Sequence, residues 1–142
     1  MMIARVHWPL LALLSVIFVI IGCANLGILA SHFGPLLRIP GIDKVAHVFL
    51  YGLLALVACY TWPKQGNAFH RAFYWAPVWV LGFALLEEFS QLFIDARSAD
   101  LGDVVADIVG VVIATTLFSI RQNVGSRVDV FSFKTARSVA RR

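Results

Sequence analysis

The chain has 142 residues, of which 60% are hydrophobic and only 14% are charged, whereas an average soluble domain has roughly 25% charged residues. Together with a mean hydropathy of +0.82, this composition excludes an ordinary soluble globule, and the length leaves room for one domain. The net charge of +4 is compatible with nucleic acid or an anionic membrane surface as a partner. Base-stacking aromatics in a basic groove are missing, so we expect no nucleic acid and favour the membrane.

Four segments are predicted to cross a bilayer as helices. They are about residues 8–30, 45–62, 73–94 and 101–120. The third is apolar only in its first part, so it must include Glu87 and Glu88 to reach the roughly 20 residues that a span needs. The fourth carries Asp107 within the span. We therefore predict an all-α integral membrane protein with four transmembrane helices in one domain, residues 1–120, and a basic tail at 121–142.

The distribution of Lys and Arg predicts the topology. With both termini in the cytoplasm, nine of the 12 basic residues lie inside, as expected for short cytoplasmic loops. The inner set is Arg5, Lys64, Arg71, Arg121, Arg127, Lys134, Arg137, Arg141 and Arg142, and the outer set is Arg38, Lys44 and Arg97. We predict an N-in, C-in membrane protein. Its tail is a topology anchor or lies on anionic inner-leaflet lipids.

The two cysteines are given no functional role. Cys23 follows a segment that loosely resembles a lipoprotein cleavage box, but the apolar run is longer than the h-region of a signal peptide, so a thiol inside the first helix is the favoured interpretation. Cys59 lies late in the second helix. Because the first two helices run in opposite directions, the sulfurs fall at different depths, and no disulfide is expected.

Polar side chains recur at helical spacing in the second, third and fourth spans. Three- and four-residue intervals place each set on one helix face, and in the predicted topology all sets lie at the outer ends of these helices. The candidate site residues are Asp43, Lys44, His47, Tyr51, Glu88, Gln91, Arg97, Asp103 and Asp107. Below them, Ala106, Gly110 and Ala114 form a small-xxx-small series that allows close helix packing.

Ionisable residues in a membrane usually face the bundle interior and mark a functional site. Asp107 is the deepest charge and the strongest candidate. Glu88 is favoured over Glu87, which would turn toward the headgroups as a solvated helix-end residue. A ligand site, interhelical hydrogen bonding alone and proton or ion passage all stay open as interpretations of this polar group.

The ordered set of motifs resembles the VanZ-like family of small bacterial membrane proteins, named for an accessory factor in teicoplanin resistance. The motifs are Asp43-Lys44-x-x-His47-x-x-x-Tyr51, Glu88-x-x-Gln91, the loop residue Arg97, and Asp103-x-x-x-Asp107-x-x-Gly110. The resemblance covers roughly residues 42–114. Two departures are visible: Asp95 and Ala96 stand where the family usually has Pro-Gly, and Asp107 stands where it often has Asn.

The resemblance implies a multi-pass protein of the bacterial cytoplasmic membrane that acts at the cell envelope, without a settled reaction. Three functions are compatible with the residues. The first is binding of a lipid-linked or headgroup-bearing ligand in an outer-leaflet polar pocket, with an effect on glycopeptide or envelope-stress tolerance. The second is a metal-dependent enzyme acting on a lipid-linked phosphate or glycosyl group, with Glu88, Asp103 and Asp107 holding Mg²⁺ or Ca²⁺ and His47 as acid or base. The third is a structural or assembly partner.

Overall fold

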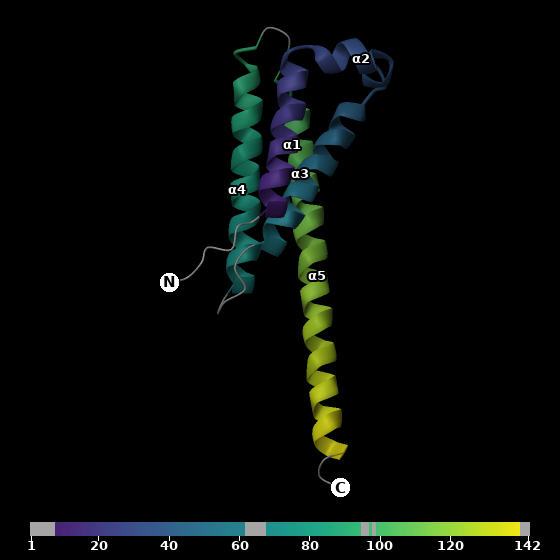
Figure 1. Ribbon diagram of the computed structural model, residues 1–142, viewed down its shortest axis with the longest axis vertical. Helices are drawn as coiled ribbons and strands as arrows, with labels where there is room; N and C mark the ends of the chain where they lie inside the picture. Colours follow the sequence, from purple (N-terminus) through teal and green to yellow (C-terminus); the bar gives the residue numbers. More distant parts are fainter. Residues whose placement is uncertain (1–7, 62–67, 95–96, 98, 140–142) are drawn as a thin grey trace.

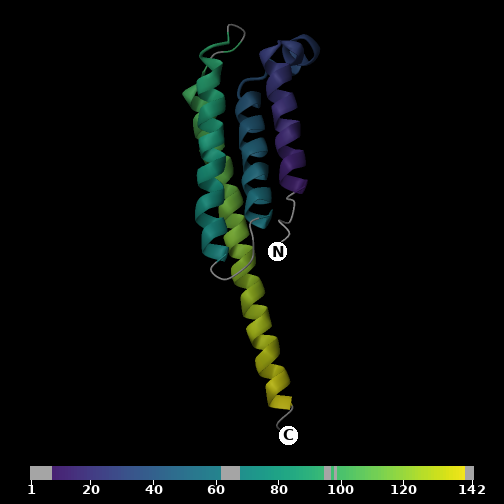
Figure 2. The same ribbon diagram turned by 60° about the vertical axis from the view of Figure 1, so that its left-hand side comes forward.

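The computed structural model describes residues 8–61, 68–94, 97 and 99–139, and all regular elements within them are helices. They are α1 (Trp8–Asn25), α2 (Ile28–Leu37), α3 (Ile42–Thr61), α4 (Ala68–Gln91) and α5 (Leu101–Val139). The helices α1, α3, α4 and the first half of α5 run side by side, while α2 lies across one end of the bundle (Figure 1; Figure 2). The predicted all-α architecture is confirmed.

Within the described residues, three helices are long and apolar enough to cross a membrane: α1, α3 and residues 101–122 of α5. The fourth predicted span, within α4, has the length, since the helix contains 24 residues, but it is less apolar because Glu87 and Glu88 lie near its end. Large hydrophobic side chains such as Trp79, Leu86 and Ile113 are exposed around the outside of the bundle. An apolar outer surface of this extent is suited to lipid contact.

The predicted span at residues 8–30 is divided by a turn. The helix α1 ends at Asn25, and Gly27 adopts a left-handed conformation with φ of +70° immediately before α2. Glycine tolerates this conformation because it has no Cβ. The 18 residues of α1 still extend about 27 Å, close to the roughly 30 Å of a hydrocarbon core. The remaining apolar residues form α2, which covers the end of the bundle.

The closest helix contact joins α3 and α5. A Cβ on Gly110 would overlap the backbone carbonyl of Val48, and a Cβ on Gly52 would lie 3.0 Å from the carbonyl oxygen of Gly110. Ala106 and Ala114 are buried on the same face of α5. The small-residue series therefore does permit close packing. By contrast, α1 has Ile17 as its one buried residue in the described chain.

The last helix continues past the predicted end of the fourth span. It runs unbroken to Val139, so the first part of the predicted tail is helical and extends away from the bundle (Figure 1). Its 39 residues correspond to about 58 Å, roughly twice the thickness of a hydrocarbon core. Several predictions fall on residues outside the described ones, namely Arg5, Lys64, Asp95, Ala96, Arg141 and Arg142.

Candidate functional site

The deepest polar contact joins α3 to α5. His47 Nδ1 lies 2.9 Å from Oδ1 of Asp107, whose residue surface is only 1% exposed. A carboxylate at this distance favours the tautomer that carries the proton on Nδ1. His47 Nε2 is then directed toward Asp103, with 3.9 Å to Oδ2. Oδ2 of Asp107 is buried and has no hydrogen-bond partner among the described residues.

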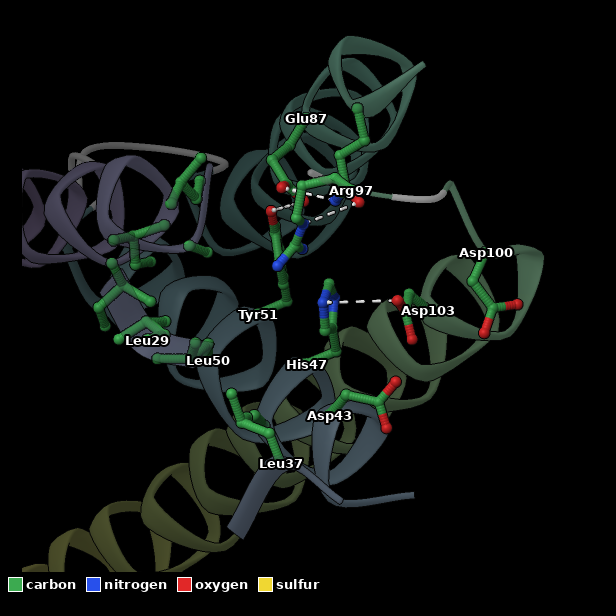
Figure 3. Close-up of a pocket in the computed structure, with 16 residues that line it drawn as sticks. Leu29, Leu37, Asp43, His47, Leu50, Tyr51, Glu87, Arg97, Asp100 and Asp103 are labelled. Atoms are coloured by element: carbon green, nitrogen blue, oxygen red, sulfur yellow. Dashed lines mark hydrogen bonds and ion pairs between the residues drawn. The ribbon is translucent and has the colours of Figure 1, made fainter. Parts of the chain in front are cut away.

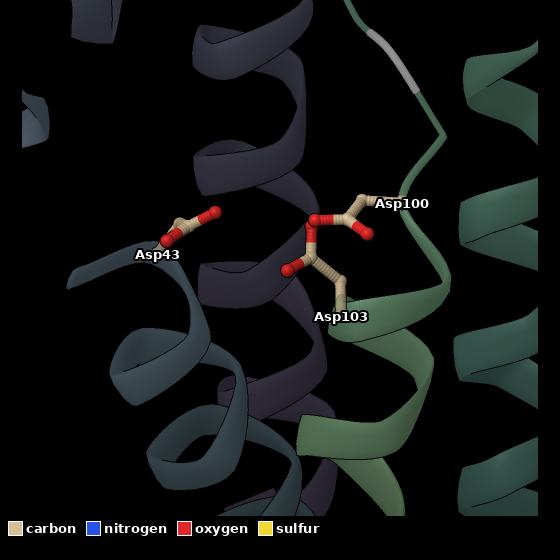
Figure 4. A group of neighbouring side chains, drawn as sticks. All are labelled: Asp43, Asp100 and Asp103. Carbon is tan, nitrogen blue, oxygen red and sulfur yellow. The ribbon is translucent and has the colours of Figure 1, made fainter. Parts of the chain in front are cut away.

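A lysine ammonium lies among three carboxylates at the start of α3 and α5. Lys44 Nζ is 2.5 Å from Oδ2 of Asp100, 3.0 Å from Oδ1 of Asp103 and 3.6 Å from Oδ2 of Asp43. The three acidic side chains come from α3, the loop before α5 and the first turn of α5 (Figure 4). The hydrogen bond from Lys44 and one from the backbone N–H of Gly102 hold the pKa of Asp100 below its usual value.

These three carboxylates are the group of acidic side chains in the described chain that lies close enough to hold a metal ion. The set considered from the sequence was Glu88, Asp103 and Asp107, which the fold does not bring together as such a group. In the observed group the Lys44 ammonium already supplies the compensating positive charge. A divalent ion would have to displace it.

A second set of polar contacts lies at the end of α4. Tyr51 donates a hydrogen bond of 3.4 Å to Oε2 of Glu87, and Gln91 Nε2 donates to Oε1 of Glu87 at 2.8 Å and to Oε2 of Glu88 at 3.2 Å. Arg97 Nε donates to Oε1 of Gln91 at 3.3 Å. The amide of Gln91 therefore bridges the carboxylate of Glu87 and the guanidinium of Arg97.

Glu88 connects the carboxylates around Lys44 with the polar contacts at the end of α4. Its Oε1 accepts a hydrogen bond from the N–H of Asp100, so this carboxylate fixes the loop that leads into α5. Asp100 in turn caps α5, since its Oδ1 accepts from the N–H of Gly102 at 2.8 Å. One hydrogen-bonded network thus extends across α3, α4 and α5.

A cavity of about 330 Å³ lies between this network and the first two helices. We call it the amphiphilic cavity because its two walls differ in chemistry (Figure 3). The apolar wall comes from α1 and α2, together with Leu50. The polar wall comes from α3, α4, α5 and the loop before α5. The polar residues that line the cavity are Asp43, His47, Tyr51, Glu87, Gln91, Arg97, Asp100 and Asp103. The lining residues from α1 and α2 are Ile17, Ile20, Ile21, Ala24, Leu29 and Leu37.

All nine predicted site residues lie in this group of hydrogen bonds and ion pairs, but three of them do not line the cavity: Lys44, Glu88 and Asp107 lie behind the wall and contact other polar groups. Two residues were missed. Glu87 is 7% exposed and lines the cavity instead of turning toward the headgroups, and its four-residue spacing from Gln91 was the available signal. Asp100 could have been identified as an N-cap residue.

The two cysteines lie in different helices. Cys23 lies in α1 and is half-buried, whereas Cys59 is buried in α3 and is flanked by the core of the bundle. Neither lines the amphiphilic cavity.

Comparison with known proteins places the chain in a family. A family model described as VanZ/LLP1 matches residues 6–122, which include every helix up to the middle of α5. No curated protein and no solved structure matches the chain. The motif-based resemblance over residues 42–114 is thus confirmed, and the match extends through α1 and α2. With its three membrane-span helices and this match, the chain is a membrane protein that belongs to the VanZ/LLP1 family.

Proposed function

We propose that the protein binds a phospholipid or lipid-linked envelope component in the amphiphilic cavity. The observation that carries this proposal is the division of one cavity into an apolar wall and a polar wall. Ligand pockets of roughly 300–1,000 Å³ with a few convergent polar groups are typical of small-molecule sites. An acyl chain would lie along α1 and α2, and a headgroup would lie against the hydrogen-bonded network.

We also propose a location and an orientation for the protein in the cell. The α4 helix forms the fourth span beside the three apolar ones, the protein lies in the bacterial cytoplasmic membrane, and the network lies toward the outer leaflet. By binding an envelope lipid there, the protein alters how the envelope meets amphiphilic antibiotics such as glycopeptides. The excess of basic residues in the last part of the chain supports this orientation.

Topology is tested with reporter fusions. We expect alkaline phosphatase, which is active only outside the cytoplasm, to be inactive when it is fused after Arg142 and active when it is inserted after Ile39, between α2 and α3. A green fluorescent protein fused after Arg142 should be fluorescent. Activity of the phosphatase at the C-terminus would contradict the proposed orientation.

Ligand binding is tested by native mass spectrometry of the full chain purified in mild detergent. We expect the wild type to retain a phospholipid and Ala24→Phe to lose most of it, because Ala24 lines the apolar wall and a phenyl ring would fill the cavity. Ala30→Phe is the matched control, since Ala30 is exposed on α2 and does not line the cavity. Equal lipid retention by both variants, with both folded, would contradict the proposal.

A second candidate is acid–base chemistry on a bound lipid phosphate. The geometry that favours it is His47, whose Nδ1 is held by Asp107 while its ring lines the cavity. This arrangement orients an imidazole for proton transfer. Incubation of the purified protein with a defined phospholipid separates the two candidates: a binding protein leaves the lipid mass unchanged, whereas an enzyme converts it and His47→Gln abolishes the conversion.

A further inference from the structure

The cavity contains an acidic and a basic side chain that are close to one another but do not pair. Glu87 is 7% exposed and lines the cavity, and its two described hydrogen bonds come from the neutral groups of Tyr51 and Gln91. Among the described residues, no cation lies within ion-pair distance of its carboxylate. A buried charge without an opposite charge is unfavourable in a low-dielectric site. The carboxylate of Glu87 can therefore form an ion pair with a cationic group of a ligand.

Arg97 presents the complementary chemistry. Among the described residues its hydrogen bond uses Nε, which donates to Gln91, and the two terminal nitrogens of the guanidinium have no partner there. A guanidinium with free donors is suited to phosphate, which it can bind in a bidentate manner. Because Gln91 lies between Arg97 and Glu87, the two charges are held apart instead of neutralising each other (Figure 3).

The net charge of the polar wall restricts the class of headgroup that can bind. Four carboxylates line the cavity, those of Asp43, Glu87, Asp100 and Asp103, against the guanidinium of Arg97. The Lys44 ammonium is engaged by three of these acids and leaves Glu87 uncompensated. A headgroup that brings only negative charge would be repelled by this excess, whereas one that brings both a phosphate and an ammonium would match both Arg97 and Glu87.

From these observations we infer that the headgroup bound in the amphiphilic cavity is a zwitterionic amino-phosphate of the phosphoethanolamine type, with its phosphate on Arg97 and its primary ammonium on Glu87. The inference rests on the proposed lipid-binding function and specifies its ligand class. The ammonium donates hydrogen bonds to Glu87, so a trimethylated amine, which has the charge but no N–H donor, binds more weakly.

The experiment is a competition measured by native mass spectrometry on the full chain. The purified protein is delipidated and incubated with equal amounts of dioleoyl phosphatidylethanolamine and dioleoyl phosphatidylglycerol, and in a second series with phosphatidylethanolamine and phosphatidylcholine. We expect the wild type to prefer phosphatidylethanolamine by about tenfold in both series, the factor given by one hydrogen bond to a charged group.

The variants assign the preference to particular atoms. Glu87→Gln should bring the ratio of phosphatidylethanolamine to phosphatidylglycerol close to one, while Arg97→Gln should reduce occupancy by all three phospholipids. Ser90→Ala is the matched control, because it changes a polar side chain of the same helix that is exposed and does not line the cavity. This control should keep the wild-type ratio of phosphatidylethanolamine to phosphatidylglycerol.

The outcomes separate the inference from the function on which it rests. If the wild type binds no phospholipid, or if Ala24→Phe retains it, the proposed function is wrong. If phospholipid is bound and Ala24→Phe loses it, but phosphatidylglycerol is bound as well as or better than phosphatidylethanolamine, the inference alone is overturned. A preference that survives in Glu87→Gln overturns the assignment of the ammonium to this carboxylate.

Discussion

Gly110→Ala is expected to lower the free energy of unfolding by at least about 2 kcal/mol, the order of magnitude for overpacking a core. The added Cβ would overlap the backbone carbonyl of Val48, and backbone cannot rotate away as a side chain does. The helices α3 and α5 would have to separate at their closest contact. Because His47 and Asp107 lie about one turn from this crossing, their hydrogen bond should be lost as well. Thermal unfolding of the detergent-purified protein measures the effect.

The chain offers two matched controls for this substitution. Gly82 is also in a helix, α4, but a Cβ there would meet nothing within 4 Å, so Gly82→Ala should leave the stability unchanged or raise it slightly through helix propensity. Gly52→Ala should give an intermediate loss, because its Cβ would lie 3.0 Å from the carbonyl oxygen of Gly110. If all three substitutions had equal effects, the close contact of α3 with α5 would not be what determines them.

Lys44→Met is expected to lower the melting temperature and to create dependence on Ca²⁺. The substitution removes the ammonium that lies among Asp43, Asp100 and Asp103 and leaves three carboxylates whose oxygens lie within 4.8 Å of one another. Carboxylate oxygens are the ligands that Ca²⁺ prefers, and weak protein sites have dissociation constants on the order of 10⁻³ M. Ca²⁺ at about 10 mM should therefore raise the melting temperature of Lys44→Met.

The wild type and Lys44→Arg serve as controls for this result. Both keep a cation among the carboxylates, so we expect Ca²⁺ to leave their melting temperatures unchanged. A rise in the wild type equal to that of Lys44→Met would mean that the ion binds elsewhere or displaces the lysine. In that case the metal-dependent function considered from the sequence would regain support.

The site was largely predictable because helical spacing is a geometric constraint. Lys44, His47 and Tyr51 share one face of α3 at intervals of three and four residues, and Asp103 and Asp107 do the same on α5. Polar side chains in a membrane bundle face its interior, where they pair with one another. Helix faces that carry them therefore turn toward each other. Spacing was therefore sufficient to identify the members of the network on α3 and α5, but not Glu87 or Asp100.

Spacing was insufficient to divide the roles of Glu87 and Glu88. Both carboxylates lie within one turn of Gln91 and both bond to it, so periodicity alone does not determine which one faces the cavity. The choice depends on where α1, α3 and the loop before α5 pack, which is tertiary information. The same holds for Lys44, whose neighbour Asp100 is 56 residues away in the chain.

The turn at Gly27 was equally hidden in the sequence. No Asp, Glu, Lys or Arg occurs from α1 through α2, and mean hydropathy does not reveal a single residue with positive φ. The helix break could be anticipated only from the glycine itself, and isolated glycines are also common inside membrane helices.

The hydrogen-bonded network takes all its members from α3, α4, α5 and the loop before α5, whereas α1 and α2 supply the apolar wall. With one buried residue, α1 contributes little to the core. Under the proposed lipid-binding function, mutations in α1 would therefore reshape the space for a hydrocarbon tail and leave the headgroup contacts intact. Tail length and headgroup identity would then evolve separately, so that this proposal expects relatives with the same polar motifs to diverge in the chain length and unsaturation of the bound lipid.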